Sequence, residues 1–239
     1  SAQFQRAPEG MLPRVAASGG CAVAADFDKD GDEDLFVGTR FVPKRYPMAG
    51  PSTLIINGTN REARTFELGM VTAAVWADID GDSWLDLLVA TEWGPLKVLQ
   101  NQKGTLKEDT LDTGLSAHSG WWNGVAAADL DHDGDIDFIA SNFGLNTKYE
   151  ASAAKPVLLY AGDFGSDGSL QIVEAVSKEN RILPVRGKSC STHAMPHLAE
   201  RFPTYRSFAS ATLPEIYSPA KLDQAIQLQA TTLASMVFL

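Results

Sequence analysis

Residues 26–34 read DFDKDGDED, so aspartate occupies positions 1, 3, 5, 7 and 9 of the stretch and glycine occupies position 6. Two further stretches follow the same plan, DIDGDSWLD at 78–86 and DLDHDGDID at 129–137. Together the three hold 14 of the 19 aspartates in a chain of 239 residues with a formal net charge of −10. Their starts are about 50 residues apart, which indicates an array of repeated structural units.

Short apolar runs precede and follow each acidic stretch. Four to six apolar residues bounded by Asp and Gly are typical of buried strands, because helices need more length. Each unit therefore reads as strand, acidic loop, strand, and Thr53–Ile56 and Lys97–Gln100 are candidate third strands, each followed by an asparagine. Repeats of this length with several short strands predict an all-β fold, a β-propeller of which three or four blades are visible. An extended β-solenoid is the rival architecture.

The spacing of the carboxylates is that of a calcium loop. Ca²⁺ takes six to eight oxygen ligands, and side chains at alternate positions wrap around one point, with a backbone carbonyl from position 7. An EF-hand is excluded, because its twelfth position must be Glu and here it is Val37, Val89 or Ala140. The predicted calcium ligands are Asp26, Asp28, Asp30, Asp32 and Asp34; Asp78, Asp80, Asp82, Trp84 and Asp86; and Asp129, Asp131, Asp133, Asp135 and Asp137.

Electrostatic repulsion favours a bound ion in each loop. Two unit charges about 4 Å apart repel by roughly 4 kcal/mol near a protein surface, and each loop gathers several such pairs. We expect about three Ca²⁺ sites, with Mg²⁺ less suited because it prefers a tight octahedral shell. The second site should be the weaker, since Ser83 stands where the other loops have glycine. A fourth copy at 163–171 has Gly165 and Gln171 at its third and ninth positions and is predicted to persist as a turn.

The sequence divides into three parts that differ in composition and in expected secondary structure. Residues 1–175 carry the repeats, residues 176–228 are predicted to form a helical insertion, and residues 229–239 are predicted to return to the propeller as a strand. The insertion is locally basic, with six Lys or Arg against two Glu in 176–206. The apolar run Met236–Leu239 ends without a turn or polar tail, so we expect the chain to be a fragment of a longer protein.

The pattern D-x-D-x-D-G-x-x-D between apolar strands resembles the FG-GAP or VCBS repeat of integrin-α-type β-propellers. The segments 141–146, 156–160 and 196–212 extend the resemblance to the bacterial ASPIC/UnbV group, relatives of cartilage acidic protein. The resemblance implies a calcium-stabilised propeller, usually seven-bladed, with the helical segment inserted between strands. It also implies an exported protein that is secreted, periplasmic or at the cell surface, although the chain contains no signal peptide.

Several function classes are disfavoured by composition. Net negative charge argues against a nucleic-acid partner, and no apolar run is long enough to span a membrane. The sequence contains no nucleophile elbow, no HExxH motif and no carboxylate pair outside the acidic loops, so no motif in it indicates an enzyme. We expect a module that binds a protein or a carbohydrate at the cell surface, as in adhesion, with calcium in a structural role.

Two other readings of that function stay open. The first is a polysaccharide-active enzyme or lectin, which a deep pocket joining His118, Trp121 and Trp122 to an unligated carboxylate would favour. The second is a purely structural spacer. A zinc site at Cys190, His193 and His197 and a disulfide between Cys21 and Cys190 are further weak alternatives.

Overall fold

A computed structural model describes residues 5–6, 17–58, 62–108 and 113–239. Within these ranges the chain is mostly β-strand in antiparallel sheets, which confirms the expectation of a β-rich fold. The first sheet has the order β1-β2-β3-β4, with bounds β1 (Gly19–Ala25), β2 (Asp34–Thr39), β3 (Ser52–Ile56) and β4 (Glu62–Phe66). The second sheet has the order β5-β6-β7-β8, with bounds β5 (Met70–Ala77), β6 (Asp86–Gly94), β7 (Lys97–Asn101) and β8 (Leu106–Glu108).

Two more sheets complete the described structure. After the short helix η1 (Leu115–Ala117), β9 (Gly120–Trp121) pairs with β6. The third sheet consists of β10 (Gly124–Ala128), β11 (Asp137–Ser141) and β16 (Met236–Phe238), and β16 comes from the end of the chain. The fourth sheet has the order β14-β13-β12-β15, with bounds β12 (Val157–Gly162), β13 (Gln171–Lys178), β14 (Arg181–Pro184) and β15 (Ile226–Ala230).

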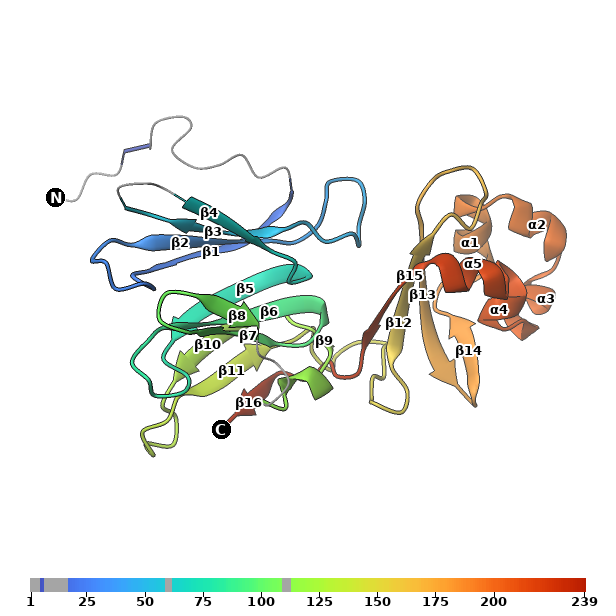
Figure 1. Cartoon of the computed structure of the whole chain (residues 1–239). Helices are drawn as coiled ribbons and strands as arrows, with labels where there is room; N and C mark the ends of the chain where they lie inside the picture. Colours follow the sequence, from blue (N-terminus) through green and yellow to red (C-terminus); the bar gives the residue numbers. More distant parts are fainter. Residues whose placement is uncertain (1–4, 7–16, 59–61, 109–112) are drawn as a thin grey trace.

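The first three sheets form a stack, and the fourth sheet lies beside it (Figure 1). Strand β6 explains how the stack is held, because it is buried on both faces. Alternate side chains of a strand point to opposite faces. Leu87 and Val89 accordingly join the core shared with the first sheet, whereas Leu88 and Ala90 join the core shared with the third sheet. The continuous apolar run that follows the second acidic loop is thus the signature of a strand in the middle of the stack.

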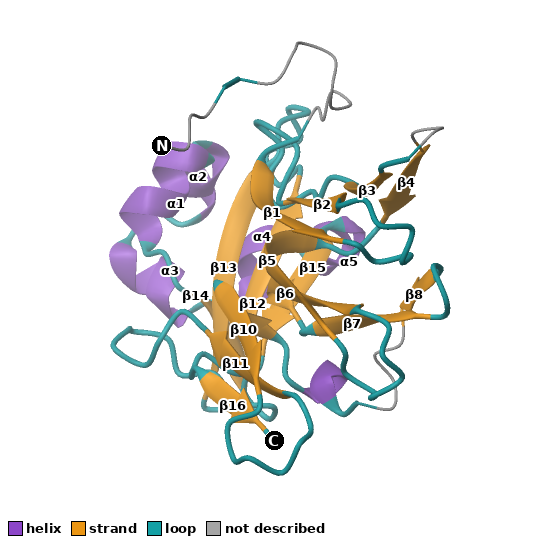
Figure 2. Ribbon diagram, turned by 90° about the vertical axis from the view of Figure 1, so that its left-hand side faces the viewer, coloured by secondary structure: helices purple, strands orange, loops and turns teal. Residues whose placement is uncertain are grey.

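Helices cover the outer face of the fourth sheet, on the side away from the stack (Figures 1 and 2). They are α1 (Lys188–Ala194), α2 (His197–Arg201), α3 (Tyr205–Ser210), α4 (Leu213–Tyr217) and α5 (Pro219–Gln224). The helical part is shorter than the predicted 176–228. Residues up to Pro184 are still strand, because β13 and β14 form a hairpin with Val176 paired to Leu183.

The segment 40–50, which has no counterpart in the later repeats, is anchored to the second sheet. Arg40 Nε donates a 2.6 Å hydrogen bond to Glu92 Oε2, and the Tyr46 hydroxyl donates to Glu92 Oε1 at 2.7 Å. Trp93 Nε1 in turn donates to the Tyr46 oxygen at 2.7 Å. Burial and the Glu92 carboxylate raise the pKa of Tyr46. The segment therefore fixes the end of β6 that faces the fourth sheet.

The first two sheets approach so closely at Gly20 that only glycine fits. A Cβ atom built on Gly20 would lie 1.9 Å from the carbonyl oxygen of Val71 in β5, whereas one on Gly19 would meet nothing within 4 Å. A backbone carbonyl cannot move aside as a flexible side chain can. The stacking distance of these sheets thus depends on one residue of β1.

We expect Gly20→Ala to destabilise the protein by about 1–3 kcal/mol, the usual cost of overpacking. Gly19→Ala is the matched control and should leave stability unchanged or slightly raised, because it only restricts the unfolded chain. Urea unfolding followed by tryptophan fluorescence measures both. Equal stability of the two variants would contradict the close approach of β1 and β5.

Candidate metal centres

Each predicted acidic loop connects the first two strands of a sheet as a long hairpin. The residue before the loop pairs with its ninth residue, as Ala25 with Asp34 and Ala77 with Asp86. Ala128 pairs with Asp137 in the same way. The ninth aspartate is therefore the first residue of the returning strand, and its side chain is held at the base of the loop.

In all three loops the carboxylates of positions 1, 3 and 9 converge. One oxygen from each lies within 4.8 Å of the other two, in the groups Asp26, Asp28 and Asp34; Asp78, Asp80 and Asp86; and Asp129, Asp131 and Asp137. The ninth aspartates Asp34, Asp86 and Asp137 are only 0%, 1% and 3% exposed. Ionised carboxylates so close together, one of them buried, repel one another unless a cation neutralises them.

The side chains at the fifth and seventh positions of each loop have a different role. The carboxylates of Asp30, Asp82 and Asp133 lie outside the convergent groups, and each accepts a hydrogen bond of 2.8–2.9 Å from the backbone N–H of position 7. This bond bends the chain at the sixth residue. The side chain of Asp32, Trp84 or Asp135 at position 7 is outside the convergent groups too, in keeping with a predicted role limited to the backbone carbonyl.

A second layer of backbone donors positions the ninth aspartate. Asp34 accepts from the N–H groups of Phe27 and Asn57 at 3.3 and 2.8 Å, and Asp86 accepts from Ile79 and Asn101 at 3.0 and 2.6 Å. The asparagine that ends the third strand of the sheet thus holds the carboxylate. The sequence showed these asparagines as strand ends but gave no sign of this contact, since it depends on strand pairing.

Two buried oxygens in the first and second loops have no hydrogen-bond partner, Asp26 Oδ1 and Asp78 Oδ1. A buried carboxylate oxygen without a donor is costly, and native proteins rarely leave one so. Desolvation raises the pKa of Asp34 and Asp86, with a smaller contribution from neighbouring aspartates.

The first and second acidic loops also contact each other, because Lys29 Nζ lies 4.5 Å from the centre of the Trp84 ring.

The backbone takes a left-handed turn at the same two positions of each loop. At position 4 these are Lys29, Gly81 and His132, with φ between 61° and 73°, and at position 6 they are Gly31, Ser83 and Gly134, with φ between 71° and 99°. Ser83 thus adopts the conformation expected from its place in the loop, at φ 71°. A side chain in this region costs about 1 kcal/mol relative to glycine.

Exchanging residues at position 6 should test this cost. We expect Ser83→Gly to stabilise the protein by up to about 1 kcal/mol and Gly134→Ser to destabilise it by a similar amount. A Cβ on Gly134 would meet no atom within 4 Å, so the effect there is one of backbone conformation alone. Thermal unfolding in chelator measures both. A stabilising Gly134→Ser would contradict the argument.

The fourth loop keeps this backbone shape but is closed by hydrogen bonds. Ser166 and Gly168, at its positions 4 and 6, have φ of 58° and 78°. Gln171 replaces the ninth aspartate: its Oε1 accepts from Gly165 N–H at 3.1 Å and its Nε2 donates to Asp167 at 3.2 Å. Lys221 Nζ of α5 adds bonds to Phe164 O and Ser166 Oγ. The Gln171 amide thus gives the loop a neutral hydrogen-bond donor in place of a carboxylate, and Lys221 adds one positive charge next to it.

The structure also bears on the alternative zinc site, the alternative disulfide and the aromatic residues. Within the described residues, groups of at least three possible metal-ligating side chains occur only at the three acidic loops, so Cys190, His193 and His197 are not assembled into a site. Cys21 and Cys190 are both free thiols. Trp122 is fully buried and its Nε1 donates to His118 O at 3.1 Å. Trp121, by contrast, lines a cavity beside the fourth sheet.

Comparison with known families supports the repeat. Residues 78–140 match the family model described as an FG-GAP-like repeat. The match begins at the first residue of the second loop and ends in β11, so it takes in the second and third loops and the strands β6 to β10 between them. A search of curated proteins found no match. No helix in the described part of the chain has the length and apolar character needed to cross a membrane.

Proposed function

We propose that this chain is a calcium-stabilised β-propeller module that binds a ligand and has no catalytic role of its own. The observation that carries the proposal is the convergence of three carboxylates in each of three matched loops, with Asp26 Oδ1 and Asp78 Oδ1 buried and unpaired. A cation at these points would satisfy the free oxygens and remove the repulsion. The all-oxygen donor set suits Ca²⁺, and the FG-GAP-like match of residues 78–140 agrees with it.

The residues proposed to hold the ion are the aspartates at positions 1, 3, 5 and 9 and the backbone carbonyl at position 7. Asp34 and Asp86 each connect the loop to the returning strand and to the asparagine that ends the third strand. An ion bound there would therefore fix three strands of one sheet at once. We assign calcium this structural role, with about three sites and the weakest in the second loop.

The propeller arrangement and the exported location are part of the same proposal. The first three sheets are stacked with β1, β5 and β10 as successive neighbours, which is how propeller blades follow one another (Figure 1). The resemblance to the ASPIC/UnbV group supports a secreted, periplasmic or cell-surface protein. In such a setting, a rigid module of this kind would bind a protein or a carbohydrate.

Calcium should raise the melting temperature strongly. A site that binds only the folded state adds about 2.7 kcal/mol at a ligand concentration 100 times its Kd, and a domain of this size gains about 2–4 °C per kcal/mol. We expect a rise of at least about 5 °C between chelator and excess Ca²⁺, with a smaller rise in Mg²⁺. Hydrogen exchange should slow in 26–34, 78–86 and 129–137 but not in 163–171. An unchanged melting temperature would refute the proposal.

Two substitutions in the first loop separate ligation from charge. Asp28 belongs to the convergent group and Asp32 does not, although both are aspartates of one loop. Asp28→Asn should weaken calcium binding by about tenfold or more, whereas Asp32→Asn should change it by less than about threefold, since only long-range charge is lost. Isothermal titration calorimetry with Ca²⁺ measures the affinity of both variants. Equal effects of the two variants would show that the loop acts as a diffuse acidic patch.

A lectin or polysaccharide-active enzyme is the second candidate, and one cavity favours it. The cavity of about 480 Å³ is lined by Trp93, Trp121 and Glu174 among others. It joins one predicted aromatic residue to a carboxylate outside the metal loops, but it includes neither His118 nor the buried Trp122. Arg186 Nε pairs with Glu174 at 3.2 Å. A carboxylate engaged in this way suits binding better than proton transfer.

A further inference from the structure

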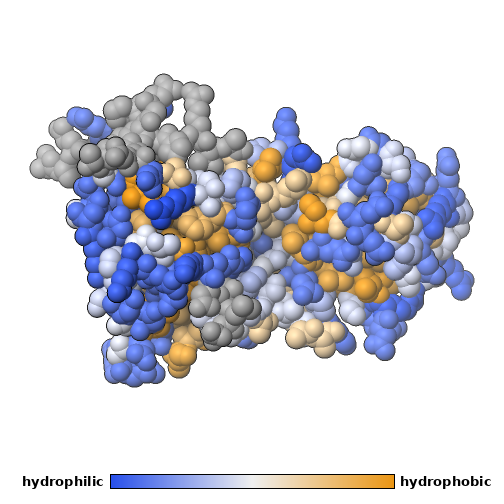
Figure 3. Space-filling model, viewed as in Figure 1, coloured by the Kyte–Doolittle hydropathy of each residue, from blue (hydrophilic) through white to orange (hydrophobic). Residues whose placement is uncertain are grey.

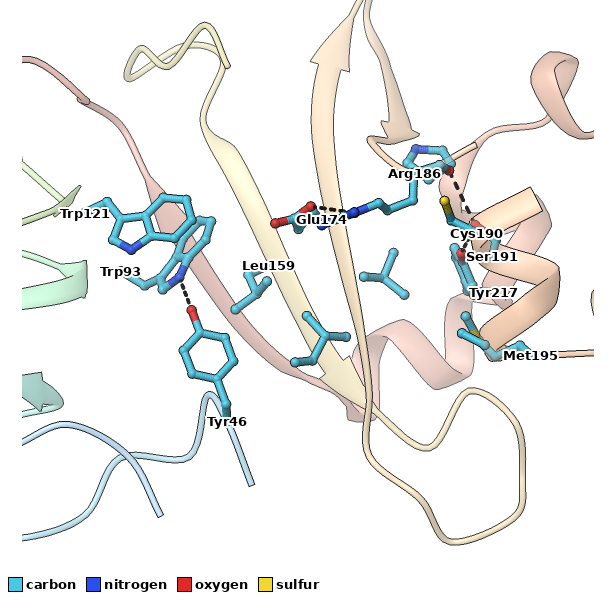
Figure 4. Close-up of a pocket in the computed structure, with 14 residues that line it drawn as sticks. Tyr46, Trp93, Trp121, Leu159, Glu174, Arg186, Cys190, Ser191, Met195 and Tyr217 are labelled. Atoms are coloured by element: carbon cyan, nitrogen blue, oxygen red, sulfur yellow. Dashed lines mark hydrogen bonds and ion pairs between the residues drawn. The ribbon is translucent and has the colours of Figure 1, made fainter. Parts of the chain in front are cut away.

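Two cavities lie next to each other along the end of β14 and the start of α1, and together they are here called the Arg186 groove. The first cavity is the one of about 480 Å³ that reaches Trp121, and the second is about 320 Å³ and reaches Tyr205. Both are lined by Pro184 and Arg186. Figure 4 shows the first cavity, with Trp121, Trp93 and Tyr46 on one side and Arg186, Cys190 and Ser191 on the other. The combined size suits an elongated ligand more than a single small ring.

The groove is positively charged in an acidic protein. Arg186 and Lys188 line it, and the Arg186 side chain is 62% exposed. No acidic side chain in the described part of the chain forms an ion pair with Lys188, whose ammonium instead lies 5.5 Å from the centre of the Tyr205 ring. The chain as a whole carries a net charge of −10. The charged side chains that line the groove are thus two cations and one carboxylate, and this net positive charge favours a negatively charged ligand.

The acidic residue that lines the groove is Glu174, and its charge is already compensated. Its Oε2 accepts from Arg186 Nε at 3.2 Å, as the dashed line in Figure 4 marks, and its side chain is only 16% exposed. Burial together with the nearby Glu174 carboxylate raises the pKa of Tyr149 to about 12, so the phenol adds no charge beside the pair. Because Arg186 and Glu174 offset each other, the net positive charge of the groove comes from Lys188.

The groove also offers flat apolar surface and hydroxyl groups. Tyr205 is 69% exposed, and its hydroxyl lies 3.0 Å from Ser189 Oγ. Phe208 and Leu183 line the second cavity beneath it. Figure 3 shows hydrophobic surface in the middle of this view, between the stack and the fourth sheet. Rings that bear hydroxyl groups and carboxylates match such a mixture, because one face of a sugar packs on an aromatic ring while its edge forms hydrogen bonds.

We propose that the Arg186 groove binds an acidic oligosaccharide, a chain of uronic acid residues, with its carboxylates at Arg186 and Lys188 and a sugar ring on Tyr205. This rests on the proposed function as a ligand-binding module and names the class of ligand. Paired guanidinium or ammonium groups and carboxylates form the strong, charge-assisted bonds that give affinity and orientation. A linear chain spans both cavities.

The test is calorimetric titration with oligogalacturonate at a fixed free calcium concentration. A neutral gluco-oligosaccharide and an oligoglutamate peptide of equal length are the comparison ligands. We expect binding of the oligogalacturonate at least about tenfold tighter than either, the gain from one charge-assisted hydrogen bond or from sugar stacking. Equal binding of the neutral sugar, equal binding of the peptide, or no binding of the uronate would each overturn the proposal.

Variants locate the site. Lys188→Glu and Tyr205→Ala should each weaken uronate binding by at least about tenfold. Lys107→Glu makes the same charge change at an exposed residue outside the groove and should alter it by less than about threefold. Unchanged melting temperatures confirm that the variants fold. Full binding by Lys188→Glu would overturn the assignment.

A second readout uses the two cysteines. Cys190 is exposed and lines the first cavity, whereas Cys21 is partly buried and burial raises its pKa. Alkylation should be faster at Cys190, and bound oligogalacturonate should slow it there by about tenfold while leaving Cys21 unaffected. Equal rates at Cys190 with and without the uronate would count against the groove. The calcium-induced rise in melting temperature, measured on the same samples, reports separately on the proposed function.

Discussion

The main physical constraint on the structure is the mutual repulsion of the carboxylates that the backbone brings together in each acidic loop. At each of three hairpins, three aspartates approach within 4.8 Å, and the one that begins the returning strand is almost completely buried. At such distances each pair of charges repels by roughly 4 kcal/mol near a protein surface. A cation bound among the three carboxylates would remove this repulsion. The fourth loop avoids the repulsion in another way, because a neutral Gln171 replaces the ninth aspartate and Lys221 bonds the backbone of the loop.

Strand β6 transmits this constraint across the molecule. It begins at Asp86, in the second acidic loop, and runs to Trp93 and Gly94 beside the fourth sheet, a span of about 25 Å at the usual rise of a strand. Along that length it is buried against the first sheet on one face and the third sheet on the other. At its far end, Glu92 holds Arg40 and Tyr46, and Trp93 lines the Arg186 groove. A cation at Asp86 would thus fix one wall of a distant binding surface.

The local structure around the acidic loops could be predicted because all of its information lies within a few residues. Alternating aspartates and short apolar flanks specify strand, turn and strand, and the left-handed residue at Ser83 follows from its position in the loop. The extent of the helical part could not be predicted as well. Lys178 and Arg181 looked like part of a basic insertion, yet they pair across a β-hairpin, since strand pairing depends on which partner strand is near. Trp121 and Trp122 are adjacent in the sequence, yet Trp122 is buried in the core and Trp121 lines the first cavity. Packing between elements, which the sequence does not show, separates their environments.

The sequence by itself determined where carboxylates would meet, because the period of the loop and the sixth-position turn are local properties of the chain. Only the tertiary structure decided how the sheets stack, which asparagines hold Asp34 and Asp86, and that Trp121, Arg186 and Tyr205 border one groove. These residues come from different sheets and helices. Their meeting is a consequence of packing between elements, which has no periodic trace in the sequence.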